Sequence, residues 1–190
     1  MCGISGIIDK QNLSINQLKV KEMNDLIIHR GPDSEGYFHT HNFSIAHRRL
    51  AILDLSSAGH QPMEYRENVI TYNGEVYNFK EIRTKLKNKG YTFASKTDTE
   101  VILAAYDYWG EDCVNHFNGM WSFAIFDKKK NIFFCSRDRF GIKPFYYTQI
   151  NNQFIFGSEI KQLLIFHDTN YANLTTLLDF LVIGLSVYFL

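Results

Sequence analysis

The apolar positions near the start of the chain follow two different periods. Residues 3–9 alternate small and apolar side chains, as a buried strand does, whereas residues 15–28 place apolar side chains on one helical face. The segment Arg30-Gly31-Pro32-Asp33 then interrupts the pattern. Short apolar runs bounded by turn residues predict further strands over 43–46, 50–53 and 69–72, with a turn over 56–62.

Helix start and stop signals fill the middle of the chain. Asn78 and Glu81 form a capping pair for a predicted helix that ends at Gly90. Thr97 and Glu100 form a capping box for a second helix, which stops at the next glycine. After it, the pattern returns to predicted strands over 120–126, 132–136, 146–148 and 154–157.

The order of these elements predicts a fold class. Strand-rich ends surround a helical centre without regular strand-helix alternation, which favours a layered α+β domain over a doubly wound parallel sheet. The sequence contains no G-x-G-x-x-G or P-loop pattern. Its 190 residues suit one domain plus a tail.

Charge and composition narrow the range of partners. Lys and Arg number 20 and so do Asp and Glu, so the net charge is zero and the single-sign field that nucleic acid or anionic lipid requires is absent. Hydrophobic residues make up 45% of the chain, as in a packed globular fold. The apolar run over 180–190 is shorter than the roughly 20 residues of a membrane span, so we expect it to pack against a missing second domain.

The cysteines and histidines bear on location and metal content. Cys2, Cys113 and Cys135 are far apart and lack zinc-site spacing, and the first ten residues do not form a signal peptide. We therefore expect a cytoplasmic protein. The seven histidines form no H-E-x-x-H group, so we interpret His29 and His47, like the others, as surface or satisfied core residues and expect no metal.

Cys2 is the first residue with catalytic potential. A small residue after the initiator Met1 allows aminopeptidase removal of Met1, after which Cys2 carries its own α-amine, a base that titrates near ~7.7 to 8. A small buried hydrophobe or a lipidation site is the alternative, and position two alone favours it. The apolar strand that follows shifts the balance, because it could hold the terminus rigidly.

Asn73-Gly74-Glu75 offers the parts of an oxyanion hole, a side-chain amide and an open backbone N–H. The alternative is an Asn-Gly hairpin turn, which is the better interpretation for the pair taken alone.

Three charged residues are ambiguous in the same way. Arg48 and Arg49 could place a guanidinium at the rim of a pocket to bind a carboxylate, or could be solvated charges at a strand end. Asp98 could bind an ammonium group, or could only favour the N-terminus of the predicted helix after Thr97.

Together these segments resemble the glutaminase domain of glutamine-hydrolysing asparagine synthetase, a class II glutamine amidotransferase. The match runs from Met1 to about residue 164, in the family's order. The segments that carry it are Met1-Cys2-Gly3-Ile4, His29-Arg30-Gly31-Pro32-Asp33, Arg49-Leu50-Ala51-Ile52-Leu53-Asp54, Tyr72-Asn73-Gly74-Glu75-Val76-Tyr77-Asn78, Asp98-Thr99-Glu100-Val101-Ile102-Leu103, Phe117-Asn118-Gly119-Met120-Trp121-Ser122-Phe123-Ala124, Arg137-Asp138-Arg139-Phe140-Gly141-Ile142-Lys143-Pro144 and Ser158-Glu159-Ile160-Lys161.

The resemblance implies the N-terminal nucleophile hydrolase fold, a four-layer αββα sandwich of two mainly antiparallel sheets between helices. It implies a glutaminase domain over 1–168 and, over 169–190, the start of a connection to a synthetase domain absent from this chain. Its implied catalytic residues are Cys2, Asn73 and Gly74. Its implied substrate-binding residues are Arg49 for the α-carboxylate, Glu75 and Asp98 for the α-amine, and Leu50, Ile52, Leu53, Asn73 and Gly74 around the rest of the ligand.

The implied reaction is hydrolysis of L-glutamine to glutamate and ammonia through a γ-glutamyl thioester on Cys2. In the family the ammonia supplies ATP-dependent asparagine synthesis from aspartate, so ATP and Mg are expected only in the synthetase domain, in cis or in trans, and this domain needs no cofactor. By analogy with the family a homodimer is expected. Two alternatives stay open: an acceptor such as a sugar acid, and a silent glutamine-binding or docking domain, for which retained Met1 would be the simplest sign.

Overall fold

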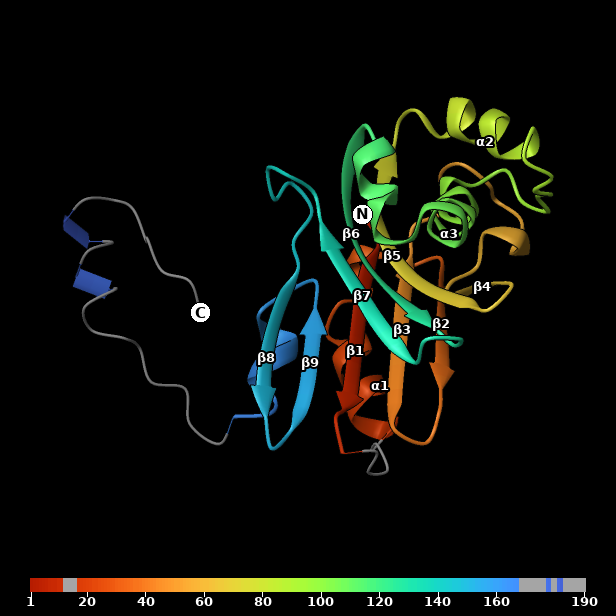
Figure 1. Ribbon diagram of the computed structural model, residues 1–190. Coiled ribbons are helices and arrows are strands. Elements are labelled where there is room, and N and C mark those ends of the chain that lie inside the picture. Colours follow the sequence, from red (N-terminus) through yellow and green to blue (C-terminus); the bar gives the residue numbers. More distant parts are fainter. Residues whose placement is uncertain (12–16, 168–176, 179–180, 183–190) are drawn as a thin grey trace.

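Five antiparallel strands form the first sheet of the computed structural model, which describes residues 1–11, 17–167, 177–178 and 181–182 (Figure 1). Their order is β2-β3-β1-β9-β8, so β1 lies at the centre and is held on both sides. The chain position directly before β1, which is Cys2, is therefore anchored to the middle of a sheet. The bounds are β1 (Gly3–Asp9), β2 (Ser34–His39), β3 (Phe43–Arg49), β8 (Tyr146–Ile150) and β9 (Gln153–Gly157).

Four antiparallel strands form the second sheet, in the order β4-β5-β6-β7. Its two central strands pair along their full length, from Asn68 opposite Asp127 to Val76 opposite Gly119. The bounds are β4 (Met63–Tyr65), β5 (Asn68–Val76), β6 (Gly119–Asp127) and β7 (Ile132–Arg137).

Helices cover the outer face of each sheet, and the sheets pack on one another (Figure 1). α1 (Gln17–Asp25) and α4 (Lys161–Leu164) lie on the first sheet, and α2 (Phe79–Lys87) and α3 (Asp98–Trp109) pack together on the second. Short 3₁₀ helices complete the described chain: η1 (Ile28–Arg30), η2 (Ser57–Gly59) and η3 (Gly110–His116). The predicted α+β sandwich with four layers is confirmed.

The alternation of β1 explains how one strand serves two layers. Ile4 points between the sheets, where it packs with Val69 and Ala124, whereas Ile7 points outward to Val20 and Met23 of α1. Successive side chains of a strand face opposite sides, so an apolar strand with both faces covered is buried along most of its length; in β1 Ile8 is the one partly exposed residue.

The strand predicted over 50–53 is wrong. These residues form an irregular loop after β3, in which the side chains of Ile52 and Leu53 are 67% and 40% exposed. The backbone of Leu50 contacts Cys2 instead of a strand, and the loop borders a pocket. A short apolar run does not distinguish a strand from such a loop.

Two further expectations need correction. Asn73 and Gly74 do not form a hairpin turn, because β5 continues through them to Val76. The side chain of Asn78 does not cap α2; it donates to the carbonyl of His116 and accepts from the N–H of Asn118. The short strands β2 and β4 were not predicted.

The expected domain boundary at 168 lies outside the described residues, as does most of the expected connection over 169–190. Along the parts of the chain that the structure does describe, every helix is too short or too polar to cross a membrane.

Candidate functional site

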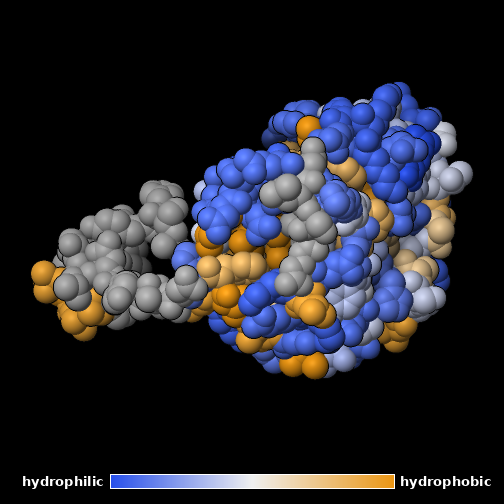
Figure 2. All heavy atoms as spheres, turned by 90° about the horizontal axis from the view of Figure 1, so that it is seen from below, coloured by the Kyte–Doolittle hydropathy of each residue, from blue (hydrophilic) through white to orange (hydrophobic). Residues whose placement is uncertain are grey.

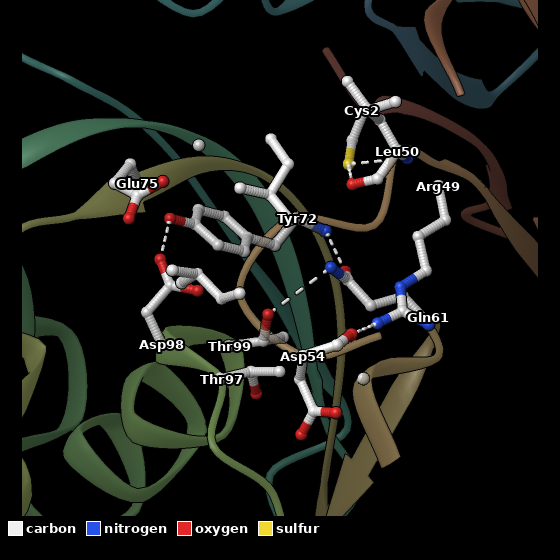
Figure 3. A pocket seen from close by; sticks show the side chains of 14 residues that line it. Cys2, Arg49, Leu50, Asp54, Gln61, Tyr72, Glu75, Thr97, Asp98 and Thr99 are labelled. Atoms are coloured by element: carbon white, nitrogen blue, oxygen red, sulfur yellow. Dashed lines mark hydrogen bonds between the residues drawn. The ribbon is translucent and has the colours of Figure 1, made fainter. Parts of the chain in front are cut away.

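Cys2 and the start of β1 are fixed by contacts from three separate segments. Its Sγ accepts a hydrogen bond from the N–H of Leu50 at 3.3 Å and donates to the carbonyl of Leu50 at 3.6 Å (Figure 3). Arg30 Nε donates to the Cys2 carbonyl at 2.9 Å, and Ser158 Oγ accepts from the N–H of Ile4 at 2.9 Å. The terminus therefore has the rigidity that a catalytic group requires.

Burial raises the pKa of the Cys2 thiol. The hydrogen bond from Leu50 and the positive charges of the chain terminus and Arg49 oppose this rise, and the Asp98 carboxylate adds to it. With Met1 attached, the nitrogen of Cys2 is a peptide amide, so no α-amine is available there as a base. Met1 lies against Lys143, whose Nζ is 3.3 Å from the Met1 Sδ.

A pocket beside Cys2 brings most of the expected site residues together (Figure 3). Asn73 is the exception: it does not line the pocket, although its side chain is buried next to Gly74, and its Nδ2 has no hydrogen-bond partner among the described residues. A buried amide donor without a partner is uncommon and calls for an explanation such as a missing ligand. The expected residues that line the pocket are Cys2, Arg49, Leu50, Ile52, Leu53, Gly74, Glu75 and Asp98.

Arg49 reaches the pocket from the end of β3. Its guanidinium donates to the carbonyl of Ser56 at 2.9 Å and to the carbonyl of Asp54. Both acceptors are neutral, and among the described residues no carboxylate forms an ion pair with Arg49. A buried guanidinium without a carboxylate partner is suited to bind an anionic ligand.

Asp98 reaches the pocket from the first residue of α3. Its Oδ2 accepts from the Tyr72 hydroxyl at 2.6 Å and from the N–H of Val76 at 3.0 Å. Burial raises the pKa of Asp98 and these hydrogen bonds lower it, while burial and the nearby Asp98 raise the pKa of Glu75. In the described chain no cationic side chain pairs with Asp98, so this corner is suited to a cationic ligand group.

The structure adds pocket residues that the sequence analysis did not assign to the site. Gln61, Tyr72, Thr97, Thr99, Asp54 and Gly59 also line it. Tyr72 stands directly before Asn73 in the sequence, but nothing in its type or spacing distinguished it from a core aromatic. Gln61 was interpreted as part of a turn.

His29 has the surface role expected of it, whereas His47 is a core residue of which only one ring nitrogen is hydrogen-bonded: among the described residues its Nδ1 has no partner. The buried His47 is neutral, because burial lowers its pKa to about 3, and its Nε2 donates to the Tyr72 carbonyl at 3.0 Å. His29 lies on the surface, 2.8 Å from Glu159. Within the described ranges, His, Cys, Asp and Glu side chains form no group of three or more that could hold a metal ion.

A second hollow lies at the opposite end of the sandwich, where apolar side chains are exposed (Figure 2). Ile8, Phe126, Phe133 and Phe154 line it together with Cys135. Burial raises the pKa of the Cys135 thiol to about 12, so this cysteine is a protonated, weakly nucleophilic group.

Comparison with known proteins agrees with this geometry. The family model described as a glutamine amidotransferase domain matches residues 1–186. Asparagine synthetases 1 and 3 (glutamine-hydrolysing) of Bacillus subtilis are 44% and 43% identical over 170 and 173 residues, covering 87% and 88% of this chain. The amidase chry2 of Gibberella zeae is 33% identical over 180 residues, which cover 87% of this chain.

The chain spans less than a third of the length of these relatives, 27% of asparagine synthetase 1, 28% of asparagine synthetase 3 and 27% of the amidase. Among solved structures, the glutamine phosphoribosylpyrophosphate amidotransferase of Bacillus subtilis superposes with a TM-score of 0.74 at 17% identity, covering 85% of this chain and 43% of that one. This likeness agrees with the expected N-terminal nucleophile hydrolase fold. The resemblance found in the sequence motifs is thus confirmed, and the chain belongs to the glutamine amidotransferase domain family.

Proposed function

We propose that this chain hydrolyses L-glutamine to glutamate and ammonia, with Cys2 as the nucleophile. The observation that carries the proposal is that two side chains of opposite charge, each without an ion-pair partner, line the pocket that contains the Cys2 thiol. Arg49 and Asp98 enter the pocket from different sides, and neither forms an ion pair within the described chain (Figure 3). An α-amino acid presents one carboxylate and one ammonium group, so it complements both charges.

In the proposed binding mode Arg49 holds the α-carboxylate, and Asp98 and Glu75 hold the α-ammonium group. The exposed loop residues Ile52 and Leu53, with Leu50, border the side-chain amide. In this assignment the cationic pocket residue faces the carboxylate of the ligand, and the two acidic pocket residues face its ammonium group.

In the proposed mechanism, removal of Met1 exposes the α-amine of Cys2, which takes the thiol proton directly or through a water. The thiolate attacks the amide carbon, and the oxyanion accepts hydrogen bonds from Asn73 Nδ2 and the Gly74 N–H. As the intermediate collapses and the C–N bond breaks, the Cys2 α-ammonium group returns the proton to the leaving nitrogen, which departs as ammonia and leaves a γ-glutamyl thioester. Water then attacks the thioester, giving glutamate and the free thiol. The unpartnered Nδ2 of Asn73 supports this role.

We further propose that the ammonia serves ATP-dependent synthesis of asparagine from aspartate by a synthetase domain, joined in cis or supplied in trans. Identities of 43% and 44% to asparagine synthetases, against 33% to the amidase, support this acceptor over another carboxylate. ATP and Mg would bind that domain, and residues 1–168 would form the glutaminase unit.

The hydrolase proposal is tested by the intact mass of the purified chain before and after incubation with a diazo-ketone analogue of glutamine. We expect protein lacking Met1 to gain one analogue, mapped to Cys2, and Cys2→Ala to gain none. Cys113 and Cys135 are internal controls, because burial raises both thiol pKa values to about 12. Processed protein that stays unlabelled would contradict the proposal and favour a silent binding domain.

The acceptor is tested with the chain joined to its synthetase region. That protein should form asparagine from aspartate, ATP and Mg with either glutamine or ammonia as nitrogen source. Its Cys2→Ala variant should use only ammonia, because the synthetase chemistry does not need the thiol. Amination of a different carboxylate, with none of aspartate, would overturn the asparagine proposal and leave glutamine hydrolysis intact.

A further inference from the structure

We infer that Tyr72 is a positioning residue, whose hydroxyl fixes the Asp98 carboxylate in the orientation that receives the α-ammonium group of the substrate. The inference rests on the proposed glutamine hydrolysis and deepens it. It assigns to an aromatic side chain the discrimination between glutamine and amides that lack the amine.

The hydroxyl contact is short, buried and directed. Tyr72 Oη donates to Asp98 Oδ2 at 2.6 Å, and the side chains of Tyr72 and Asp98 are almost wholly buried. Figure 3 shows the Tyr72 ring extending across the pocket wall with its hydroxyl at Asp98. A hydrogen bond to a carboxylate inside a protein is stronger than one between neutral groups, so it restricts the rotation of Asp98.

The backbone of Tyr72 is fixed by two side chains from outside β5. Its N–H donates to Gln61 Oε1 at 2.7 Å, and its carbonyl accepts from His47 Nε2 at 3.0 Å. Gln61 Nε2 in turn lies 3.4 Å from Thr99 Oγ1, one residue beyond Asp98. The position of the hydroxyl relative to the start of α3 is therefore set by contacts on several sides, as a positioning group requires.

Burial and nearby negative charge keep Tyr72 in its donor form. Burial raises the pKa of Tyr72 well above its ordinary value, and the neighbouring Asp98, Glu75 and Cys2 raise it further. At neutral pH the phenol is therefore protonated, and its proton stays available to the carboxylate. Burial raises the pKa of Asp98, and the hydrogen bond from the Tyr72 hydroxyl lowers it. Loss of that hydroxyl would therefore raise the pKa of Asp98 further.

The test compares two ligands in the Cys2→Ala background, which binds without turnover: L-glutamine and glutaramate, which lacks only the α-amine. Calorimetric titration should show that Tyr72→Phe raises the Kd of glutamine about tenfold or more and changes that of glutaramate by less than about twofold. Tyr106→Phe is the matched control, because its hydroxyl meets a different carboxylate, Asp127 at 3.3 Å, away from the pocket. It should change neither constant.

A double-mutant cycle of Tyr72→Phe and Asp98→Asn separates a positioning role from a general loss of structure. If Tyr72 acts through Asp98, the double variant should bind glutamine no more weakly than Asp98→Asn alone. Equal weakening of both ligands by Tyr72→Phe, or unchanged glutamine binding, would overturn the inference. Failure of glutamine to bind when Tyr72 is intact would instead overturn the proposed function.

Discussion

Arg48 and Arg49 are identical side chains at successive positions, yet they make different contacts. Arg48 donates to the Asn24 carbonyl and forms ion pairs with Asp25 and Glu35 at 2.6 and 2.9 Å. Arg49 points to the pocket and meets only neutral carbonyls among the described residues. Successive residues of β3 face opposite sides of the sheet, which explains the difference. The local pattern marked both as candidates, and only the family resemblance selected Arg49.

Replacing Arg49 should chiefly weaken glutamine binding. We expect Arg49→Ala to raise the KM for glutamine by about 10- to 100-fold, because charge-assisted hydrogen bonds contribute about 1.5–3 kcal/mol. Arg49→Lys should also raise KM, since lysine keeps the charge but loses the planar fork. Steady-state ammonia release measures both. The neighbouring Arg48→Lys should leave KM unchanged, and an unchanged KM in Arg49→Ala would remove Arg49 from the binding site.

At the scale of elements, β5 shows why a local signal can mislead. Asn73-Gly74 is a strong turn signal, but here the pair continues a strand that aligns with Ser122 and Trp121 of β6. Glycine is needed at position 74 for close approach: a Cβ there would lie 2.8 Å from the Trp121 Cα and would collide with the Met120 carbonyl. Cross-strand packing overrides the turn preference, and only the fold reveals it.

Gly74→Ala should therefore destabilise the domain. We expect a loss of about 1–3 kcal/mol in the free energy of unfolding, measured by urea denaturation, because the new methyl group meets backbone that cannot move alone. Gly3→Ala is the comparison. Its Cβ would first meet Cδ1 of Ile27, the end of a side chain, so its loss should be smaller. Equal losses would contradict the close-approach argument.

The cap signals illustrate the same limit at two helices. Thr97 caps α3 as predicted, since its Oγ1 accepts from the Glu100 N–H at 3.3 Å. Glu100 itself binds the N–H groups of Ala94 and Ser95, which precede the helix. Asn78 has an equally suitable side chain, but its amide instead binds the carbonyl of His116 and the N–H of Asn118, in a segment about 40 residues further along the chain. Long-range polar contacts compete with local capping, and the sequence does not rank them.

At the scale of the whole molecule, Glu159 joins the end of the domain to its beginning. Its carboxylate lies 2.8 Å from His29 and 3.2 Å from Arg30, and Arg30 holds the Cys2 carbonyl. Burial raises the pKa of Glu159, but the hydrogen bonds from Lys161, His29 and Arg30 outweigh it and lower the pKa from 4.5 to about 2. The folded state therefore favours the ionised carboxylate.

This contribution has a defined pH window. The stabilisation of the folded state by the ionised Glu159 carboxylate is fully present above the ordinary pKa of 4.5 and is lost as the pH falls toward about 2. We expect Glu159→Gln to lower the free energy of unfolding at pH 7 by about 1–2 kcal/mol, allowing for its partial exposure, and the difference to shrink between pH 5 and pH 2. Denaturant titrations across pH measure it. Glu64 forms an exposed ion pair with Lys128, so Glu64→Gln should have little effect on the free energy of unfolding at any pH. A loss of stability in Glu159→Gln that does not vary with pH would contradict this argument.

The sequence by itself determined the candidate nucleophile and most of the scaffold: a cysteine that processing can place at the terminus, an apolar strand behind it, and a family pattern of motifs in order. It did so because strand alternation, helix caps and nucleophile chemistry are local properties. Only the tertiary structure decided that Leu50 contacts Cys2, that Arg48 pairs with Asp25 outside the pocket, and that Tyr72 meets Asp98. These contacts join residues 26 to 48 positions apart or depend on which face of a strand is buried, and no local pattern encodes either.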